Sequence, residues 1–271
     1  MEKVIFITGA SKGFGKHWAE TLLQNGFKVA ATARKLSDLD DLVATYGEAV
    51  LPLELDVNDR EACFSAIEKA HGRFGRIDVL ISNAGYGQFG MIEELSEAEA
   101  RQQLETNVFG SLWVIQAVLP IMRSQNSGHI LQVSSIGGIV AYPSLGIYHA
   151  SKWAVEGMCE ALSKEIAMFG IKVTLIEPGG YSTEWGNKSA KFSQPIEAYN
   201  PIRDFLKNMG SKMEQGVPNA TGQAILQVIN SDNPPLRLFL GSNPLPNAEA
   251  TYKARLETWR EWNEVSVNAQ K

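Results

Sequence analysis

The chain has 271 residues, of which 44% are hydrophobic, and carries a formal net charge of −5 at pH 7. This length fits one α/β domain with a large core, and the negative charge argues against nucleic acid as a main partner. The two cysteines, Cys63 and Cys159, stand far apart in no metal-ligand pattern and are typical of buried free thiols in a reducing compartment. No cleavable signal sequence is visible, and the apolar stretch 112–122 is too short to span a membrane. We therefore expect a cytoplasmic protein without a membrane span or a metal site.

Apolar runs and helical patterns alternate along the chain. We expect seven strands, which begin near Lys3, Lys28, Val50, Val79, His129, Lys172 and Arg237. Helical periodicity lies between them over residues 15–25, 36–46, 59–72, 96–122 and 151–169. This alternation predicts an α/β fold with a seven-stranded parallel sheet and helices on both faces. No repeat or linker divides the chain, so residues 1–271 form a single domain in this interpretation.

The first strand leads directly into a glycine-rich turn. Residues 4–7 are an apolar run as in a strand buried on both faces, and Gly9, Gly13 and Gly15 follow before a helix. Glycines permit a tight turn and the close approach of a pyrophosphate to backbone N–H groups at the helix N-terminus. The spacing is G-x-x-x-G-x-G, so a merely structural turn is an alternative for this motif on its own.

Three residues in the middle of the chain suit proton transfer to and from an alcohol oxygen. Tyr148 and Lys152 stand four apart and share one face of a helix, and Ser135 lies thirteen residues before the tyrosine. An ammonium beside a phenol stabilises the phenolate, which lowers the pKa of the tyrosine from about 10. A serine hydroxyl nearby can hold a carbonyl oxygen meanwhile. Ser134 is the rival to Ser135 for that role.

These motifs together resemble the short-chain dehydrogenase/reductase family over nearly the whole chain. The turn at residues 8–15 matches the cofactor motif of that family, and residues 83–85 match its Asn-Ala-Gly motif. Its four catalytic residues match Asn107, Ser135, Tyr148 and Lys152. The resemblance implies a single-domain Rossmann fold and an oxidoreductase. In the family the lysine also binds the nicotinamide ribose, and the asparagine positions a water that links the lysine to solvent.

The resemblance also implies a set of cofactor-binding residues in the glycine turn and after the strands. They are Gly9, Ser11, Lys12, Gly13, Phe14, Gly15, Arg34, Asp56, Val57, Asn83, Ala84, Gly85, Tyr148, Lys152, Pro178, Gly179, Tyr181 and Thr183. The acid at position 56 matches the one that meets the adenine. The segment that begins at position 178 matches the one that holds the nicotinamide end.

Charge at the end of the second strand predicts NADP(H) as the cofactor. Folds that prefer NAD place an acid there, but this strand ends at Ala33 and Arg34 follows. A guanidinium can bind a 2′-phosphate through charge-assisted hydrogen bonds, and Lys12 adds a second positive charge. Asp38 and Asp40 come too late and belong to the next helix. Ordinary solvated surface charges are the alternative.

We therefore expect an NADPH-dependent carbonyl reductase, or equally an alcohol dehydrogenase, with Tyr148 as the general acid and Ser135 at the carbonyl oxygen. The candidate pocket residues are mostly apolar, which favours a neutral, fairly hydrophobic ketone or secondary alcohol. They are Tyr86, Phe89, Ile139, Tyr142, Tyr181, Trp185 and Phe192, and those expected to bind substrate are Ser135, Tyr142, Tyr148 and Trp185. We expect no catalytic role for His149 and a structural one for Glu177.

Two alternatives use the same scaffold: an epimerase or dehydratase, and a non-catalytic NADP(H)-binding regulator. Regulators of this kind tend to lose a catalytic residue, and this chain keeps all four matches. The stretches 83–87 and 234–238 also resemble the retinol- and steroid-dehydrogenase-like branch of the family.

Two late segments depart from the strand-and-helix alternation. Residues at about 182–217 mix Gly, Asn, Ser and Pro with isolated aromatics, which predicts a flap of short helices over the active site. Residues at about 247–267 place Tyr252, Leu256, Trp259 and Trp262 at helical spacing. This apolar face belongs either to the core or to a contact with a neighbouring subunit, and we expect a homodimer or homotetramer.

Overall fold

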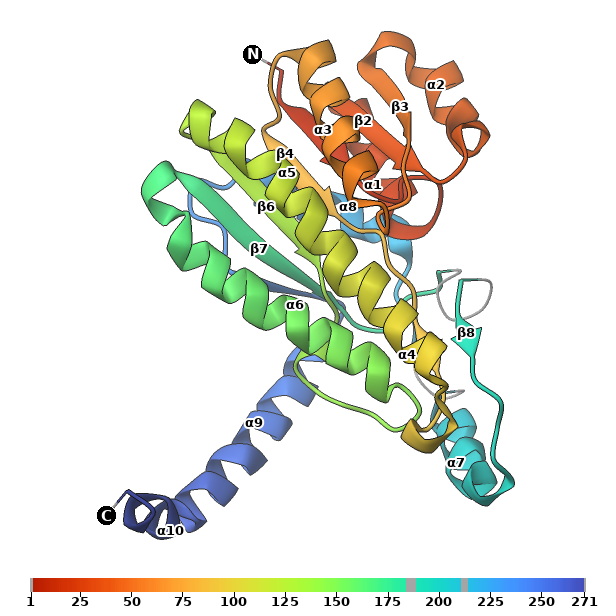
Figure 1. Cartoon of the computed structure of the whole chain (residues 1–271), viewed down its shortest axis with the longest axis vertical. Coiled ribbons are helices and arrows are strands. Elements are labelled where there is room, and N and C mark those ends of the chain that lie inside the picture. Colours follow the sequence, from red (N-terminus) through yellow and green to blue (C-terminus); the bar gives the residue numbers. More distant parts are fainter. Residues whose placement is uncertain (1, 184–188, 211–213, 271) are drawn as a thin grey trace.

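The computed structural model describes residues 2–183, 189–210 and 214–270. Seven parallel strands form one sheet in the order β3-β2-β1-β4-β6-β7-β9 (Figure 1). The strands are β1 (Val4–Ile7), β2 (Lys28–Ala33), β3 (Val50–Glu54), β4 (Val79–Ser82), β6 (Gly128–Val133), β7 (Ile171–Pro178) and β9 (Arg237–Leu240). The predicted seven-stranded parallel sheet of a single Rossmann-type fold is confirmed.

Helices cover both faces of the sheet. On one face lie α3 (Arg60–Phe74), α5 (Gly110–Gln125) and α6 (Gly146–Glu165), and on the other α1 (Gly13–Gln24) and α8 (Thr221–Asn230) (Figure 1). Successive strand side chains point to opposite faces, and in β1 Ile5 and Ile7 join the core under α1 whereas Phe6 joins the core under α3 and α5. Both faces of each central strand are therefore apolar, as the sequence indicates.

The strand order places a ligand crevice at the carboxyl ends of β1 and β4. The chain runs outward from β1 to β2 and β3, and then returns to the other side of β1 with β4. In open α/β sheets ligands bind at the point where the order reverses. The loops that leave these two strands are the glycine turn and the Asn-Ala-Gly segment, so the topology brings both predicted cofactor motifs to one edge.

Two predicted helices have different bounds in the structure. The helix expected at 96–122 consists of α4 (Glu97–Leu104), a π-helical turn (Glu105–Phe109) and α5. The helix expected to begin at 151 begins at Gly146, two residues after Ser144, which adopts a left-handed conformation. Gly146 and the β-branched Ile147 are weak helix formers, which is why the sequence pattern places the start too late.

The stretch Glu97–Gln125 is, among the described residues, a helix long and apolar enough to cross a membrane by length and composition alone. In this fold α5 lies against the sheet, and its Val114, Val118 and Met122 are fully buried in the core that it shares with α3. The apolar residues of α5 thus have a place in the core, which is a sufficient reason for its hydrophobicity.

The segment predicted as a flap of short helices contains a strand as well. β8 (Lys191–Phe192) pairs with β5 (Gln88–Phe89), and α7 (Asn200–Gly210) follows. Beyond the sheet, α9 (Pro244–Glu261) and α10 (Asn263–Asn268) project away from the body of the molecule (Figure 1). The buried residues of α9 are Pro244 and Ala248 near its start, and farther along Arg255 lies over the Trp153 ring of α6 at 4.9 Å. The apolar residues of this tail are therefore not part of the core.

A buried hydrogen bond joins α1 to α8, and it yields a test of the fold. The indole Nε1 of Trp18, a fully buried residue, donates to Thr221 Oγ1 at 2.7 Å. Thr221→Val keeps the shape of the side chain but leaves the indole N–H without its acceptor, so we expect a loss of about 1–3 kcal/mol in the free energy of unfolding. Denaturant titration measures this loss. The same change at exposed Thr45 is the control and should have little effect; equal losses at both positions would contradict this account.

Candidate active site

The glycine turn has the shape that its sequence predicts. Gly9 and Gly13 adopt positive φ angles of 68° and 54°, a region that other residues rarely occupy. A Cβ added to Gly15 would lie 2.2 Å from the carbonyl oxygen of Gly9, so only glycine lets α1 begin so close to the turn. The result is a turn whose backbone is free to approach an anionic group.

Thr8 joins the glycine turn to the Asn-Ala-Gly loop. Its hydroxyl accepts hydrogen bonds from the backbone N–H groups of Asn83 and Ala84, both at 2.9 Å. The Asn83 side chain donates in return to the carbonyl oxygens of Thr8 and Gly9 at 2.9 and 3.0 Å. Thr8 belongs to the matched octapeptide, but its chemical type alone does not indicate this role. Together these bonds hold the two cofactor motifs at a fixed spacing.

The two cationic side chains expected to bind the cofactor phosphate lie at the surface. The turn lies beside the end of β2, where the Ala10 N–H donates to the carbonyl oxygen of Thr32 at 2.8 Å. Lys12 and Arg34 are exposed, and within the described part of the chain neither side chain has a protein partner. Asp38 lies in a short 3-10 helix (Leu36–Leu39) and Asp40 begins α2 (Asp40–Tyr46), as predicted.

The loop after β3 carries the two other residues expected near the adenine. Asp56 is exposed, and its carboxylate accepts from the backbone N–H of Asn58 at 3.0 Å. Val57 is buried against Gly110 at the start of α5. The acid therefore faces solvent on a tight turn, where it is available to a ligand.

Asn107 lies in the π-helical turn, and this turn is what points its amide into the site. The amide is buried, accepts from the backbone N–H of Tyr86 at 3.1 Å and donates to the Tyr86 carbonyl oxygen at 3.0 Å. It also donates to Ser151 Oγ at 3.0 Å, and Ser151 in turn donates to the carbonyl oxygen of Tyr148 at 2.6 Å. π-Helical turns are common at functional sites. Here Asn107 fastens the Asn-Ala-Gly loop to the helix that carries Tyr148.

The structure brings the other three predicted catalytic residues together. Ser135 Oγ accepts from the Gly137 N–H at 3.0 Å, and the serine is hydrogen-bonded to Tyr148. The Lys152 ammonium lies 5.7 Å from the centre of the Tyr148 ring and donates to the carbonyl oxygen of Val133 at 2.9 Å. Ser135, rather than Ser134, is therefore the serine beside the tyrosine.

Burial dominates the electrostatics of the site. It raises the pKa of Tyr148 to about 12, against the hydrogen bond from Ser135, which lowers it. It also lowers the pKa of Lys152 to about 8, against the charge of Glu156. The sequence predicts a lowered tyrosine pKa, and this arrangement differs because desolvation outweighs the other effects and the ammonium is bonded to Val133. A neutral phenol is the form that can give a proton.

His149 is hydrogen-bonded to the neighbouring loop. Its buried ring accepts a hydrogen bond from the Tyr142 N–H at 3.3 Å through Nδ1. Burial lowers the pKa of His149 to about 4, so the ring is neutral near pH 7. That it has no catalytic role stays a prediction.

Four of the predicted pocket residues contact another aromatic ring or a polar side chain. Phe89 and Phe192 stack at 5.1 Å across the β5–β8 pair. Tyr181 packs edge-on against Phe14 at the glycine turn, also at 5.1 Å. Tyr142 accepts a hydrogen bond from Asn247 of α9 at 3.4 Å.

The remaining pocket candidates have their own surroundings. Ile139 packs in a small buried cluster with Ala248 of α9. The ring of Tyr86 lies 4.8 Å from the Lys191 ammonium.

The segment predicted to hold the nicotinamide end follows β7. Pro178 ends this strand, and the Gly179 N–H donates to the Leu240 carbonyl oxygen at 2.9 Å. Thr183 is hydrogen-bonded through its N–H to the carbonyl oxygen of Tyr181 at 2.8 Å. Trp185 lies outside the described residues.

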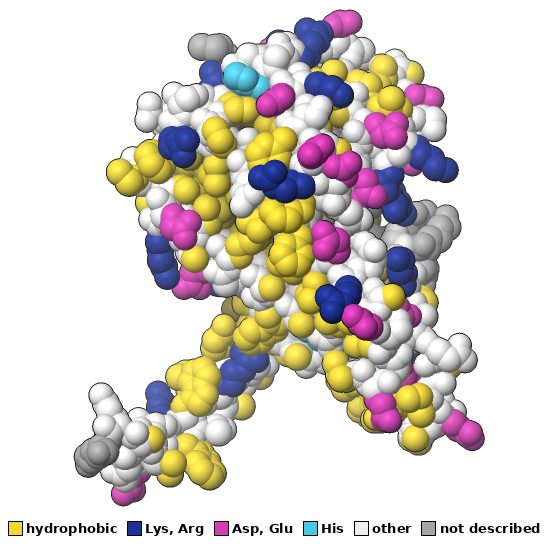
Figure 2. Space-filling view, in the orientation of Figure 1, with side chains coloured by type: hydrophobic (Ala, Val, Ile, Leu, Met, Phe, Trp, Pro, Cys, Tyr) yellow, Lys and Arg dark blue, Asp and Glu magenta, His cyan; other side chains and the backbone are white. Residues whose placement is uncertain are grey.

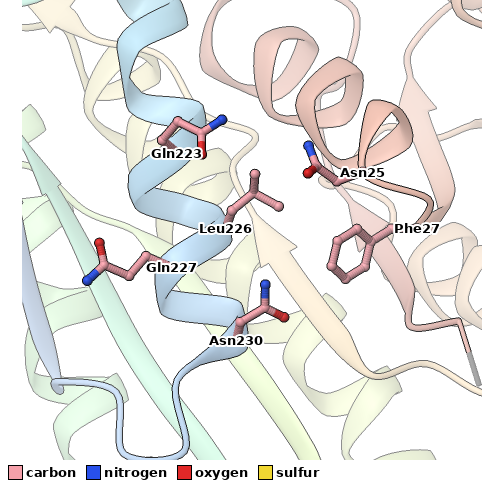
Figure 3. Close-up of a pocket in the computed structure, with 6 residues that line it drawn as sticks. All are labelled: Asn25, Phe27, Gln223, Leu226, Gln227 and Asn230. Carbon is pink, nitrogen blue, oxygen red and sulfur yellow. The ribbon is translucent and has the colours of Figure 1, made fainter.

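A separate groove opens between α8 and the end of α1 (Figure 3). Its lining residues are Asn25, Phe27, Gln223, Leu226, Gln227 and Asn230. It borders the amino end of β2, away from the carboxyl ends of the strands, and its six lining side chains include no titratable group. Because this groove offers no titratable side chain, the crevice at the other end of the sheet is the better candidate for the active site.

Comparison with known proteins identifies the family. The family model for short chain dehydrogenase matches residues 3–194. The chain is 40% identical to oxidoreductase BOA17 of Botryotinia fuckeliana, over 98% of this chain and 99% of that protein. It is 39% identical to 3-ketodihydrosphingosine reductase of Bacteroides thetaiotaomicron, over 88% of each protein.

Solved structures agree. A short-chain dehydrogenase from Streptomyces avermitilis has a TM-score of 0.91 at 36% identity and covers 99% of this chain and 98% of its own. A short chain dehydrogenase from Burkholderia cenocepacia in complex with NADP has a TM-score of 0.77 at 27% identity, with 96% and 97% coverage. With the geometry above, these similarities establish that the chain is an oxidoreductase and belongs to the short-chain dehydrogenase family.

Proposed function

We propose that the chain is an NADPH-dependent carbonyl reductase that interconverts C=O and CH–OH groups. The observation that carries the proposal is the position of Tyr148, hydrogen-bonded to Ser135 and one helical turn from Lys152, at the edge of the sheet that holds the glycine turn. This set of side chains can move one proton to or from an oxygen atom, which is the step that must accompany hydride transfer to a carbonyl.

The side chains divide this proton transfer among them. Ser135 donates a hydrogen bond to the carbonyl oxygen, where negative charge develops. Tyr148 gives its hydroxyl proton to that oxygen as general acid, and takes a proton back when the alcohol is oxidised. The Lys152 ammonium stabilises the phenolate that the transfer leaves behind. NADPH, when bound, supplies the hydride.

The residues present fit a dinucleotide with a 2′-phosphate. The turn at Gly9, Gly13 and Gly15 leaves room for a pyrophosphate beside the start of α1. Arg34 and Lys12 are exposed cations without protein partners in the described part of the chain, so both are available to a phosphate. The NADP complex of the Burkholderia relative supports the same cofactor here.

A neutral, fairly hydrophobic ketone or secondary alcohol is the substrate class that we infer. The Phe89–Phe192 stack and the Tyr181–Phe14 pair place aromatic surface beside the loops of the site. The Bacteroides relative is named as a 3-ketodihydrosphingosine reductase, that is, as an enzyme that reduces a ketone. Both observations favour reduction of an apolar ketone.

Two exposed apolar regions support a homodimer or homotetramer. Figure 2 shows hydrophobic side chains along the projecting tail and on the face over α3 and α5. On that face Phe109 stacks on Trp113 at 5.9 Å, and Arg60 lies over the Trp113 ring at 5.5 Å. On the tail Trp259 and Trp262 are 59% and 62% exposed. Patches of this kind mark interaction surfaces, and a second copy of the chain is the occupant that we propose.

The first test of the reaction is Tyr148→Phe, which removes only the hydroxyl. We expect NADPH-dependent ketone reduction to slow by roughly 10² to 10⁴, the range for loss of a general acid. NADPH binding should persist. Steady-state kinetics on a ketone panel measure the rate, and Tyr46→Phe, away from the site, serves as the control. A Tyr148→Phe variant that turns over at the rate of the wild type would refute the mechanism.

The second test concerns the cofactor phosphate. Arg34→Ala should weaken NADPH binding by about 1.5–3 kcal/mol, the scale of a charged hydrogen bond, and leave NADH binding nearly unchanged. Titration calorimetry with both cofactors measures the difference. Arg123→Ala, at the far end of α5, changes the net charge equally and should affect neither cofactor. Equal losses for NADPH and NADH in the Arg34 variant would assign this side chain to the fold instead.

The third test concerns assembly. Light scattering of the wild type should give two or four times the chain mass of 29.7 kDa. The double variant Trp259→Ala/Trp262→Ala should shift the distribution toward smaller species, because it removes apolar area that a partner covers. Met168→Ala, an exposed apolar residue between α6 and β7, is the control. A wild type with the mass of one chain at all concentrations would exclude the assembly.

A further inference from the structure

A cluster of buried charged groups lies one helical turn from the catalytic lysine. Glu156 follows Lys152 on α6, and both side chains are buried. Glu177, near the end of β7, is fully buried, and Arg237 is the first residue of β9. The sequence pattern predicts a structural role for Glu177 and indicates nothing for the other two. Three elements far apart in the sequence thus meet beside Lys152.

Arg237 joins three carboxyl groups. Its Nε lies 3.0 Å from Glu156 Oε2 and 3.5 Å from Glu177 Oε1, and its Nη2 lies 2.9 Å from Glu160 Oε2. One guanidinium cannot neutralise three carboxylates. Glu160 is partly exposed and also bonded to Lys164, which leaves the two buried carboxyl groups, Glu156 and Glu177, to share Arg237. A proton on one of them removes the repulsion between two buried charges, and Glu177, the more deeply buried, is the one for which ionisation costs most.

Unsatisfied atoms in the cluster locate that proton. Within the described part of the chain, Ser134 Oγ, Glu156 Oε1 and both carboxyl oxygens of Glu177 are buried without a hydrogen-bond partner. Two ionised carboxylates only accept, so they cannot bond to one another. Burial, and then the charge of Glu156, raises the pKa of Glu177. A proton on Glu177, shared in a hydrogen bond with Glu156, satisfies both groups and leaves Glu156 as the anion.

The Lys152 ammonium needs such an anion. It is buried, and it donates to a neutral acceptor, the carbonyl oxygen of Val133. Burial lowers the pKa of Lys152, and the charge of Glu156 is what opposes this fall. Glu160 lies a further turn along α6 and is bonded to Arg237 and Lys164, and Tyr148 on the preceding turn is neutral because burial raises its pKa.

We propose that Glu156 is a positioning residue of the active site, whose carboxylate keeps the Lys152 ammonium charged so that Lys152 can stabilise the Tyr148 phenolate. Arg237 and protonated Glu177 hold Glu156 in the orientation and charge state that this requires. The proposal rests on the proposed function, since carbonyl reduction is what gives the charge on Lys152 its role. It adds to the four family residues a fifth group, held by the last strand of the sheet.

Glu156→Gln tests the proposal because it keeps the shape of the side chain and removes its charge. The titration of Lys152 can be followed by NMR in protein that carries isotope-labelled lysine, with the signal assigned by its loss in Lys152→Arg. We expect the Lys152 pKa to fall by roughly one pH unit when the nearby charge is removed. This measurement needs no substrate, so it remains valid even if no ketone is reduced and the proposed function fails.

Kinetics supply the second readout. Reduction should slow as pH rises through the Lys152 pKa, because a neutral amine does not stabilise the phenolate. The high-pH limb of the kcat profile should therefore move to lower pH in Glu156→Gln, by a similar amount to the NMR shift. Glu177→Gln replaces one neutral group by another, and Glu160→Gln removes a charge one turn farther away. Both controls should leave the two titrations close to those of the wild type.

An unchanged Lys152 pKa in folded Glu156→Gln protein would overturn the proposal, as would an equal fall in Glu177→Gln. The thermal unfolding midpoint and NADPH binding establish that each variant is folded. If the Gln variant does not fold, Glu156→Asp and Glu156→Asn form a second pair that differs only in charge. The same fall in the Lys152 pKa is expected between those two, and its absence would also refute the role of the carboxylate.

Discussion

A positive charge inside the protein is the constraint on which this active site depends. Lys152 is buried, and an isolated buried ammonium loses several kcal/mol of hydration that the protein must replace. The carbonyl oxygen of Val133 supplies part of this and the charge of Glu156 adds to it, although burial still lowers the pKa of Lys152 to about 8. Because Arg237 holds Glu156 from 81 positions along the chain, the last strand of the sheet contributes to the charge state of the reacting groups.

Polar side chains hold the loops of the active site at fixed positions relative to one another. Parallel strands bring several loops to one edge of a sheet, and the backbone groups of those loops need partners once they are buried. Thr8 and Asn83 satisfy these groups between the first and fourth strands, and Asn107 does so between the fourth strand and α6. The same residues that complete the hydrogen bonding also fix the spacing between cofactor motif and tyrosine. The hydrogen bonds that stabilise these loops therefore also preorganise the active site.

The sequence was most informative where a local rule applies. Apolar runs such as residues 4–7 locate the strands, and the positive φ angles of Gly9 and Gly13 follow from a residue type with few alternatives. The thirteen-residue spacing in the resembled family favours Ser135 over Ser134, and Ser135 is the serine that is hydrogen-bonded to Tyr148. Local patterns also predicted a helix over residues 36–46 that contains Asp40, and the structure has a 3-10 helix (Leu36–Leu39) followed by α2 there.

Long-range effects could not be predicted in this way. The contact of Glu156 and Glu177 with Arg237 joins α6, β7 and β9, and no periodicity in one segment contains it. The π-helical turn around Asn107 depends on tertiary hydrogen bonds to Tyr86 and Ser151. The pKa of Tyr148 depends on how deeply the whole fold buries it, so the one-turn spacing to Lys152 predicted the wrong direction.

The exposed apolar side chains of α9 and α10 also depend on what buries them. Helices are marginal in water unless an apolar face packs against something, and the buried residues of α9 are Pro244 and Ala248 near its start. Burial of a side chain as large as Trp259 contributes about 1.5–3 kcal/mol, a gain that the single chain forgoes. The start of α9 nevertheless contacts two of the predicted pocket residues, because Asn247 donates to Tyr142 and Ala248 packs on Ile139. The helix that carries the exposed tryptophans is therefore the same helix that packs on these two predicted pocket residues.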